Sequence, residues 1–314
     1  MQIKMHQNKN QNKNQHEPVL LNQVLTYLEP KSGETYLDLT AGYGGHAKAI
    51  TDRTGNLDQA VLVDRDVNAT KALKKLFSNS TVKILKADYL TASQNLIATK
   101  QQFDLILADL GVSSPHLNEG KRGFSITNSG PLDMRMDQDQ VLDAKTIVNS
   151  YSEADLTRIL KLYGEEPRAR AIAKAIIKAR PLNTTTDLAD VVKKIWPKKS
   201  RLHPATRTFQ ALRIEVNKEL ELLEGSLPLW LDLLAPGGRI VVISFHSLED
   251  RLVKRAFKDV SGNRLDAQFK LLTKRPVTAS PHEIVHNPRA RSAKLRAAAK
   301  INKKGNLHAD NGQK

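Results

Sequence analysis

Short apolar strands alternate with helical segments through the first half of the chain, and this alternation restricts the fold more than any other feature. We expect strands over 35–39, 60–64, 82–85 and 103–110, with helices over 67–77 and 91–100. Strands that are separated by single helices build a parallel sheet with helices on both faces. The sequence therefore predicts an α/β, Rossmann-like fold that binds its ligand at the carboxyl edge of the sheet.

The pattern changes between 118 and 205, where apolar strand runs disappear and amphipathic helical runs replace them. We expect helices over 151–163, 166–180 and 186–196. The strand–helix pattern returns with one long helix over 206–234, a turn at 235–238, a strand over 239–245 and a helix over 248–257. Two further strands, over 269–273 and 293–298, are expected to complete the sheet.

These changes divide the chain into a sheet domain, an inserted helical domain and two polar ends. We expect a disordered polar leader over 1–15, the sheet domain over 16–117 and 206–302, the helical insertion over 118–205, and a basic polar tail over 303–314. The leader is rich in Asn, Gln and Lys and does not have the apolar segment of a signal peptide.

The composition excludes several classes of protein. The formal net charge is +16, and residues 251–314 carry 16 Lys or Arg against 4 Asp or Glu, which favours a nucleic-acid partner. The chain has no Cys, so disulfides, Cys-bound zinc and thiolate nucleophiles are excluded. No apolar run is long enough to cross a membrane, and the His residues are not spaced as metal ligands. We expect a soluble cytoplasmic protein that binds neither membrane nor metal; the sequence makes no prediction of its oligomeric state.

A Gly-rich turn after the first strand predicts a cofactor site. The segment DLTAGYGGH (38–46) lets the backbone turn tightly and approach a ligand, and Asp64 closes the next strand, where a carboxylate can accept bonds from ribose hydroxyls. This pattern also fits a nicotinamide dinucleotide. However, we expect Asp38, Asp88 and Asp109 to add negative charge to the same pocket. Such charge repels a pyrophosphate and attracts the cationic groups of S-adenosylmethionine, which we therefore favour.

Seven motifs follow one another along the chain. They are DLTAGYGGH (38–46), DLGVSSPHL (109–117), RGFS (122–125), GPLDMRM (130–136), HPATRTFQALRI (203–214), SFHSLEDR (244–251) and NPRARS (287–292). In this order they resemble the RsmH (MraW) family of bacterial 16S ribosomal RNA methyltransferases, from His16 to about Asn302. The resemblance implies a class I S-adenosylmethionine-dependent methyltransferase sheet with a helical insertion. It also implies methylation of the exocyclic N4 amine of one cytidine in the decoding region of 16S ribosomal RNA, and we expect this RNA to be bound within the small ribosomal subunit.

The resemblance also implies which residues contact the cofactor. Carried over motif by motif, these positions are Gly44, Gly45, His46, Asp64, Tyr89, Asp109 and His116. His116 stands where the family commonly has Gln, and Tyr89 where it often has Phe. An aromatic side chain at position 89 keeps a ring that can pack against adenine.

The loop after the fourth strand is expected to carry the chemistry. Cytosine N4 is a weak nucleophile because its lone pair is delocalised into the ring, so hydrogen-bond acceptors must localise that pair. Asp109, Ser113 and Ser114 offer such acceptors, and the sequence does not choose one general base among them. The absence of Cys removes the covalent route to carbon 5 of a pyrimidine and leaves attack by a nitrogen or oxygen.

Substrate contacts are expected from Arg207, His246 and Arg251, which could hold the flipped base or its phosphate. Ser247 is expected to cap the helix that follows the fifth strand, and Phe209 is expected in the core. Other functions stay open at this point: methylation of DNA or another RNA, a nicotinamide oxidoreductase, or a noncatalytic RNA-binding or ribosome-assembly factor that keeps a methyltransferase fold.

Overall fold

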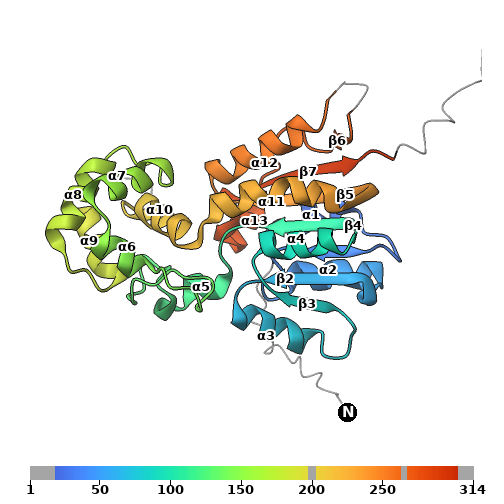
Figure 1. Ribbon diagram of the computed structural model, residues 1–314, viewed down its shortest axis with the longest axis horizontal. Helices are drawn as coiled ribbons and strands as arrows, with labels where there is room; N and C mark the ends of the chain where they lie inside the picture. The colour runs from blue at the N-terminus through green and yellow to red at the C-terminus, as the bar shows by residue number, and fades with distance from the viewer. Residues whose placement is uncertain (1–17, 197–202, 263–266, 303–314) are drawn as a thin grey trace, which may run out of the picture.

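The computed structural model describes residues 18–196, 203–262 and 267–302, and it places a helical layer beside a sheet domain (Figure 1). The expected leader, 1–15, and the expected tail, 303–314, lie outside the described residues. Within the described residues, none of the helices combines the length and apolar character that a membrane crossing requires.

The described part of the chain forms a seven-stranded sheet in the order β3-β2-β1-β4-β5-β7-β6. The strands are β1 Tyr36–Asp38, β2 Ala60–Asp64, β3 Lys83–Lys86, β4 Phe103–Asp109, β5 Leu234–Ser244, β6 Phe269–Leu271 and β7 Lys294–Lys300. Neighbours among β1 to β5 pair in parallel, whereas β7 runs antiparallel to both β5 and β6. The expected mostly parallel sheet is confirmed, and its parallel strands all end at one edge.

Helices cover both faces of the sheet because strand side chains alternate between two apolar layers. On one face α1 (Leu21–Leu28), α2 (Gly45–Thr54) and α3 (Val67–Leu76) pack against Leu62, Leu105 and Val241. On the other face α4 (Tyr89–Ala98), α11 (Glu219–Leu233) and α12 (Ser247–Asp259) pack around the fully buried Trp230. This packing fixes the strand ends, and so the site, on a rigid support.

The helical layer lies at the carboxyl edge of the sheet (Figure 1). Its helices are α5 Ser114–Asn118, α6 Ala144–Ser150, α7 Glu153–Leu162, α8 Ala169–Ala179, α9 Thr185–Lys193 and α10 Thr206–Asn217. They share an apolar core to which α10 contributes Phe209, Ala211, Leu212 and Val216. Since α10 packs with this layer, we propose that the insertion extends to Asn217, beyond the expected boundary at 205.

The single long helix expected over 206–234 is wrong, because the structure breaks it at Lys218. Lys218 has a left-handed backbone (φ 50°), so α10 ends at Asn217 and α11 begins at Glu219. The buried Asn217 side chain donates to Met134 O (2.8 Å) and accepts from Met136 N (2.9 Å). These bonds tie the end of α10 to the segment after α5.

Two other segments differ from expectation. β5 begins at Leu234 rather than at 239, and the expected turn at 235–238 becomes an irregularity within the strand, where the register against β4 shifts between Phe103 and Leu105. A short helix, α13 (Pro281–His286), precedes the segment 287–292 and was not expected. That segment reaches the site described next.

Candidate functional site

A cavity of about 1360 Å³ opens at the carboxyl edge of the sheet. Its walls come from the Gly-rich turn, the ends of β2 and β4, the loop after β4, α10, the start of α12 and the segment 287–292. A pocket for one small molecule usually has about 300–1,000 Å³. This cavity therefore has room for a cofactor and for part of a second ligand.

The Gly-rich turn after β1 lies against the cavity and against Asp64. Asp64 Oδ2 accepts from Gly42 N (2.8 Å) and Asp64 Oδ1 accepts from Asp66 N (2.8 Å), so two backbone amides fix the carboxylate. Burial raises the pKa of Asp64 above its usual range. A carboxyl group held in this way can accept hydrogen bonds from ribose hydroxyls or attract a cation.

Gly44 and Gly45 shape the turn because a Cβ at either position would contact a neighbouring side chain that must then move. Gly44 has φ 85°, and a Cβ there would lie 2.5 Å from Leu76 Cδ2. A Cβ on Gly45 would lie 2.6 Å from Pro18 Cγ. The first turn of α2 therefore approaches the cavity with bare backbone, which leaves its amides free of side-chain cover.

Asp38 does not line the cavity, which corrects the expectation that its charge adds to the pocket. Residues two apart in a strand face the same side, so Asp38 points with Tyr36 into the sheet domain. Its carboxylate accepts from Tyr36 Oη (2.7 Å) and Thr40 N (3.1 Å), and its side chain is buried. Burial raises the pKa of Asp38 to about 7. The acids that do line the cavity include Asp52, Asp64, Asp88 and Asp109.

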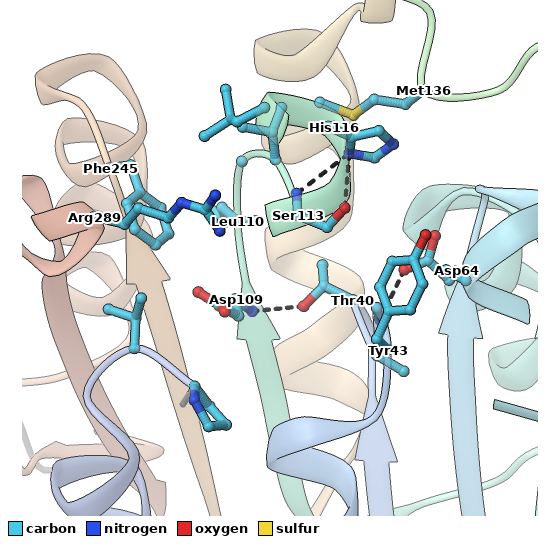
Figure 2. Close-up of a pocket in the computed structure, with 18 of the residues that line it drawn as sticks. Thr40, Tyr43, Asp64, Asp109, Leu110, Ser113, His116, Met136, Phe245 and Arg289 are labelled. Atoms are coloured by element: carbon cyan, nitrogen blue, oxygen red, sulfur yellow. Dashed lines mark hydrogen bonds between the residues drawn. The ribbon is translucent and has the colours of Figure 1, made fainter. Parts of the chain in front are cut away.

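Asp109 ends β4 at the centre of the site (Figure 2). Its backbone N donates to Thr40 Oγ1 (2.6 Å), and its Oδ2 lies 3.7 Å from His46 Nε2. Its buried Oδ1 has no hydrogen-bond partner among the described residues. Burial, together with the charges of Asp38 and Glu249, raises the pKa of Asp109 well above its usual range. Burial lowers the pKa of His46 to about 4, so this imidazole is neutral.

The loop after β4 brings Ser113 and His116 to the cavity wall (Figure 2). His116 Nδ1 lies 3.0 Å from Ser113 Oγ and accepts from Ser113 N (3.2 Å). His116 Nε2 lies 2.7 Å from Asp66 Oδ2, which also accepts from Arg122 (3.1 Å). Both ring nitrogens of His116 are thus bonded inside the protein. A cofactor contact by this residue would use the ring carbons. Ser114 opens α5 through its backbone.

Tyr89 lines the cavity and also contacts a polar cluster formed by Arg213 and Glu219. Its hydroxyl donates to Glu219 O (3.1 Å), and its ring packs edge-on against Trp230 with centroids 5.5 Å apart. Arg213 pairs with both carboxylate oxygens of Glu219, at 2.8 and 2.7 Å. Burial and the neighbouring Glu219 and Glu249 charges raise the pKa of Tyr89. The aromatic surface expected at position 89 is therefore in place.

His246 is the N-cap of α12, so the expectation that Ser247 caps this helix is wrong. His246 Nδ1 accepts from Glu249 N (3.3 Å), and the Glu249 carboxylate accepts from Phe245 N (2.8 Å). Burial alone would raise the pKa of Glu249, but bonds from His246 and the charge of Arg213 lower it. His246 Nε2 lies 3.2 Å from Glu249 Oε1. The cavity therefore has a rigid polar wall.

Three of these side chains are close enough to share a metal ion. The ligand atoms of Glu219, His246 and Glu249 lie within 4.8 Å of one another. Arg213, however, already occupies both oxygens of Glu219. This pairing fits a buried ion-pair network, and the absence of a metal stays a prediction.

Arg207 and Arg251, two of the three expected substrate contacts, lie outside the cavity lining and meet at Glu165. Arg207 Nη1 donates to Glu165 O (3.0 Å), and Arg251 Nη2 lies 3.0 Å from Glu165 Oε1. Ser247 Oγ donates to the other carboxylate oxygen. Each of Arg207 and Ser247 directly follows a cavity-lining residue, so the cluster lies at the rim.

Several cavity residues were not among the sequence predictions. Arg289 and Arg291, with Phe124 and Phe245, line the cavity. The motif NPRARS (287–292) lies in the basic C-terminal region, and that charge was the available signal for the two arginines. Phe209 lines the cavity and is also part of the insertion core, which confirms its expected burial.

The cavity fits S-adenosylmethionine on the chain's own features. It combines a turn of bare backbone, a fixed acid after β2, an aromatic ring at Tyr89 and a buried Asp109 oxygen without a partner among the described residues. Carboxyl groups with raised pKa values favour a cation, because a cation can take the place of the proton. With the strand order β3-β2-β1-β4-β5-β7-β6 and an antiparallel β7, these features define a class I S-adenosylmethionine-dependent methyltransferase.

Comparison with known proteins places the chain within that class. Residues 13–301 match the MraW methylase family, so the chain belongs to this family. It is 46% identical over 290 residues to the ribosomal RNA small subunit methyltransferase H of Trichormus variabilis, with 91% of this chain and 92% of that protein covered. The proteins of that name from Synechocystis sp. (46% identity, 91% and 93% covered) and Thermomicrobium roseum (44%, 91% and 94%) are similar as well.

Proposed function

We propose that the protein transfers a methyl group from S-adenosylmethionine to the exocyclic N4 amine of one cytidine in the decoding region of 16S ribosomal RNA. When bound, the cofactor supplies an electrophilic methyl group. Asp64 and Tyr89 hold its adenosine part, with the turn at Gly44, Gly45 and His46. The relatives of the protein are named ribosomal RNA small subunit methyltransferase H, which supports ribosomal RNA as the substrate.

The observation that carries this proposal is the buried carboxylate oxygen of Asp109 without a partner among the described residues, in a cavity larger than one cofactor requires. Methyl transfer is a direct displacement, so the protein mainly aligns donor and acceptor. An acceptor amine that donates to Asp109 gains electron density at nitrogen, and the ionised carboxylate stabilises the positive charge that develops there. Asp109, Ser113 and Ser114 form the catalytic loop.

Substrate binding is assigned to Arg207, His246 and Arg251 at and near the rim. His246 lines the cavity and faces the base, while the two arginines hold backbone phosphates. Glu165 holds Arg207 through its backbone carbonyl and Arg251 through its carboxylate, so a phosphate binds Arg251 by taking the place of that carboxylate. The substrate is RNA within the small ribosomal subunit, and the protein acts in the cytoplasm.

Mass spectrometry tests the target nucleotide. Digested 16S ribosomal RNA from a strain that lacks the protein should have lost one N4-methylated cytidine, and expression of the wild-type chain should restore it. Retention of the modified nucleotide in the deletion strain would contradict the assignment. A purified protein that methylates DNA or a different RNA instead would support the alternative substrates. Protein that binds ribosomal RNA but takes up no S-adenosylmethionine would support a noncatalytic assembly factor.

A further inference from the structure

Ser113, His116 and Asp66 form a continuous chain of hydrogen bonds that begins at the cavity wall. Ser113 Oγ lies 3.0 Å from His116 Nδ1, and His116 Nε2 lies 2.7 Å from Asp66 Oδ2. Ser113 and His116 line the cavity, whereas Asp66 does not. The chain of bonds therefore leads from the place where the acceptor binds into the protein interior.

The backbone amide of Ser113 fixes the direction of the hydrogen bonds that link Ser113, His116 and Asp66. Ser113 N can only donate, and it lies 3.2 Å from His116 Nδ1, so Nδ1 is an acceptor. In the neutral ring the proton is then on Nε2 and is donated to Asp66. The Ser113 hydroxyl consequently donates to Nδ1. One lone pair of its oxygen accepts from the His116 backbone amide in the capping box of α5, and the other remains available to the cavity.

Two further hydrogen-bond donors keep the Asp66 carboxylate an acceptor. Asp66 is buried and also accepts from Asn68 N (2.9 Å) and Arg122 Nη1 (3.1 Å). Burial alone would raise its pKa, but the bond from His116, the amide bond and the charge of Arg122 lower it to about 2. Arg122 also donates to the backbone carbonyls of Arg135 and Met136, which fixes its position.

We propose that Ser113, His116 and Asp66 form a proton relay that takes the proton of the acceptor amine during methyl transfer. The order of groups is that of a serine–histidine–aspartate triad, used here to accept a proton from an amine. The inference rests on the proposed function, since it needs an amine acceptor in the cavity.

The step balances in protons and electrons. The amine nitrogen bonds to the methyl carbon as the sulfur–carbon bond breaks, and sulfur keeps that electron pair. The nitrogen then passes one proton to Ser113 Oγ while the Ser113 hydroxyl proton moves to His116 Nδ1. The resulting imidazolium donates from both nitrogens, with the ionised Asp66 stabilising it, and releases the proton to water after the product leaves.

The charged groups around the His116 ring come from two segments. Asp64 and Asp66 lie at the end of β2 and the start of α3, and Arg122 follows α5. Phe124 covers the ring with centroids 4.9 Å apart. A protonated His116 cannot accept the proton of Ser113, so we expect the rate of methyl transfer to fall on acidification.

The variant His116→Gln provides the test. A Gln side chain can accept from Ser113 N and donate to Asp66, which preserves the fold, but it cannot take up a proton. Single-turnover methyl transfer to small ribosomal subunits should fall more than tenfold in His116→Gln and in Ser113→Ala. Cofactor affinity should stay within about twofold of wild type, and the acidic limb of the wild-type pH–rate profile should be absent from His116→Gln. The exposed His282→Gln is the matched control.

Several outcomes would contradict the proposed relay. If His116→Gln keeps the wild-type rate and pH profile, His116 only caps α5 and the relay is wrong. A double variant Ser113→Ala, His116→Gln that is much slower than either single variant would also overturn it, because members of one relay are not additive. Nitrogen-15 NMR of the cofactor-free protein gives a second readout that does not depend on activity: the relay requires a neutral His116 with its proton on Nε2. Failure of wild-type protein to methylate ribosomal RNA would instead count against the proposed function.

Discussion

Glu165 and Arg251 form an ion pair (Oε1 to Nη2, 3.0 Å) that joins the helical insertion to the sheet domain. Glu165 lies between α7 and α8, whereas Arg251 lies on α12. Ser247 and Arg207 bond to the same residue, and the environment lowers the pKa of Glu165, mainly through the bond from Ser247. In the proposed function, an RNA phosphate takes the position of this carboxylate.

Removing this charge should strengthen RNA binding. The Glu165–Arg251 pair is half exposed, and such pairs contribute about 0–1 kcal/mol, so Glu165→Gln should barely change the free energy of unfolding. The freed Arg251 should lower the Kd for a ribosomal RNA fragment about two- to fivefold and make the salt dependence steeper by about one counterion. Filter binding over a range of salt concentrations measures both effects. Glu153→Gln, which removes an exposed acid within the insertion, is the control. Weaker binding by Glu165→Gln would contradict the assignment.

Asp38 should lower the stability of the protein at neutral pH. An unfolded Asp has a pKa of about 3.9, whereas burial raises that of Asp38 to about 7. Between these values the folded state binds the extra proton, so the contribution of Asp38 to stability falls as the pH rises. We expect Asp38→Asn to raise the free energy of unfolding by about 1–3 kcal/mol at pH ~8, and to change it little near pH ~4. Urea denaturation at both pH values, with the exposed Asp58→Asn as control, measures this. A loss of stability in Asp38→Asn at the higher pH would show the reasoning to be wrong.

The sequence predicted the sheet well because its signals are local. Apolar runs marked the strands, and the ends of strands placed Asp64 and Asp109 at one edge. Position at a strand end does not decide which way a side chain faces, however. Asp38 turns toward Tyr36 and leaves the cavity, which the sequence argument missed.

Contacts between segments that lie far apart in the sequence could not be predicted from it. The break at Lys218 follows from Asn217, whose partners Met134 and Met136 lie some eighty residues earlier in the chain. Glu165 meets Arg251 only because the insertion folds back to the sheet domain. No local pattern encodes either contact.

Substitutions at the two glycines that flank α2 should distinguish the effect of backbone strain from a loss of cofactor binding. Gly44 and Gly55 both have left-handed backbones, at φ 85° and 62°, but only a Cβ on Gly44 meets other atoms within 4 Å. Left-handed geometry costs an Ala residue about 1–2 kcal/mol. We therefore expect both Gly44→Ala and Gly55→Ala to lower the melting temperature, with the larger loss at Gly44. Only Gly44→Ala should weaken binding of S-adenosylhomocysteine, which calorimetry measures; equal affinity in both variants would remove the turn from the cofactor site.

Asp109 should link cofactor binding to pH. Its pKa is raised by burial and by the charges of Asp38 and Glu249, so a cation that pairs with the ionised carboxylate competes with a proton. Affinity for S-adenosylmethionine should consequently rise with pH, because the ionised carboxylate becomes more abundant. Asp109→Asn should flatten this dependence and reduce turnover by more than tenfold. Asp52→Asn is the control, because Asp52 also lines the cavity but is exposed and paired with Lys48. Titration calorimetry at several pH values gives the affinities; an unchanged pH dependence and a wild-type rate in Asp109→Asn would remove Asp109 from both the cofactor site and the chemistry.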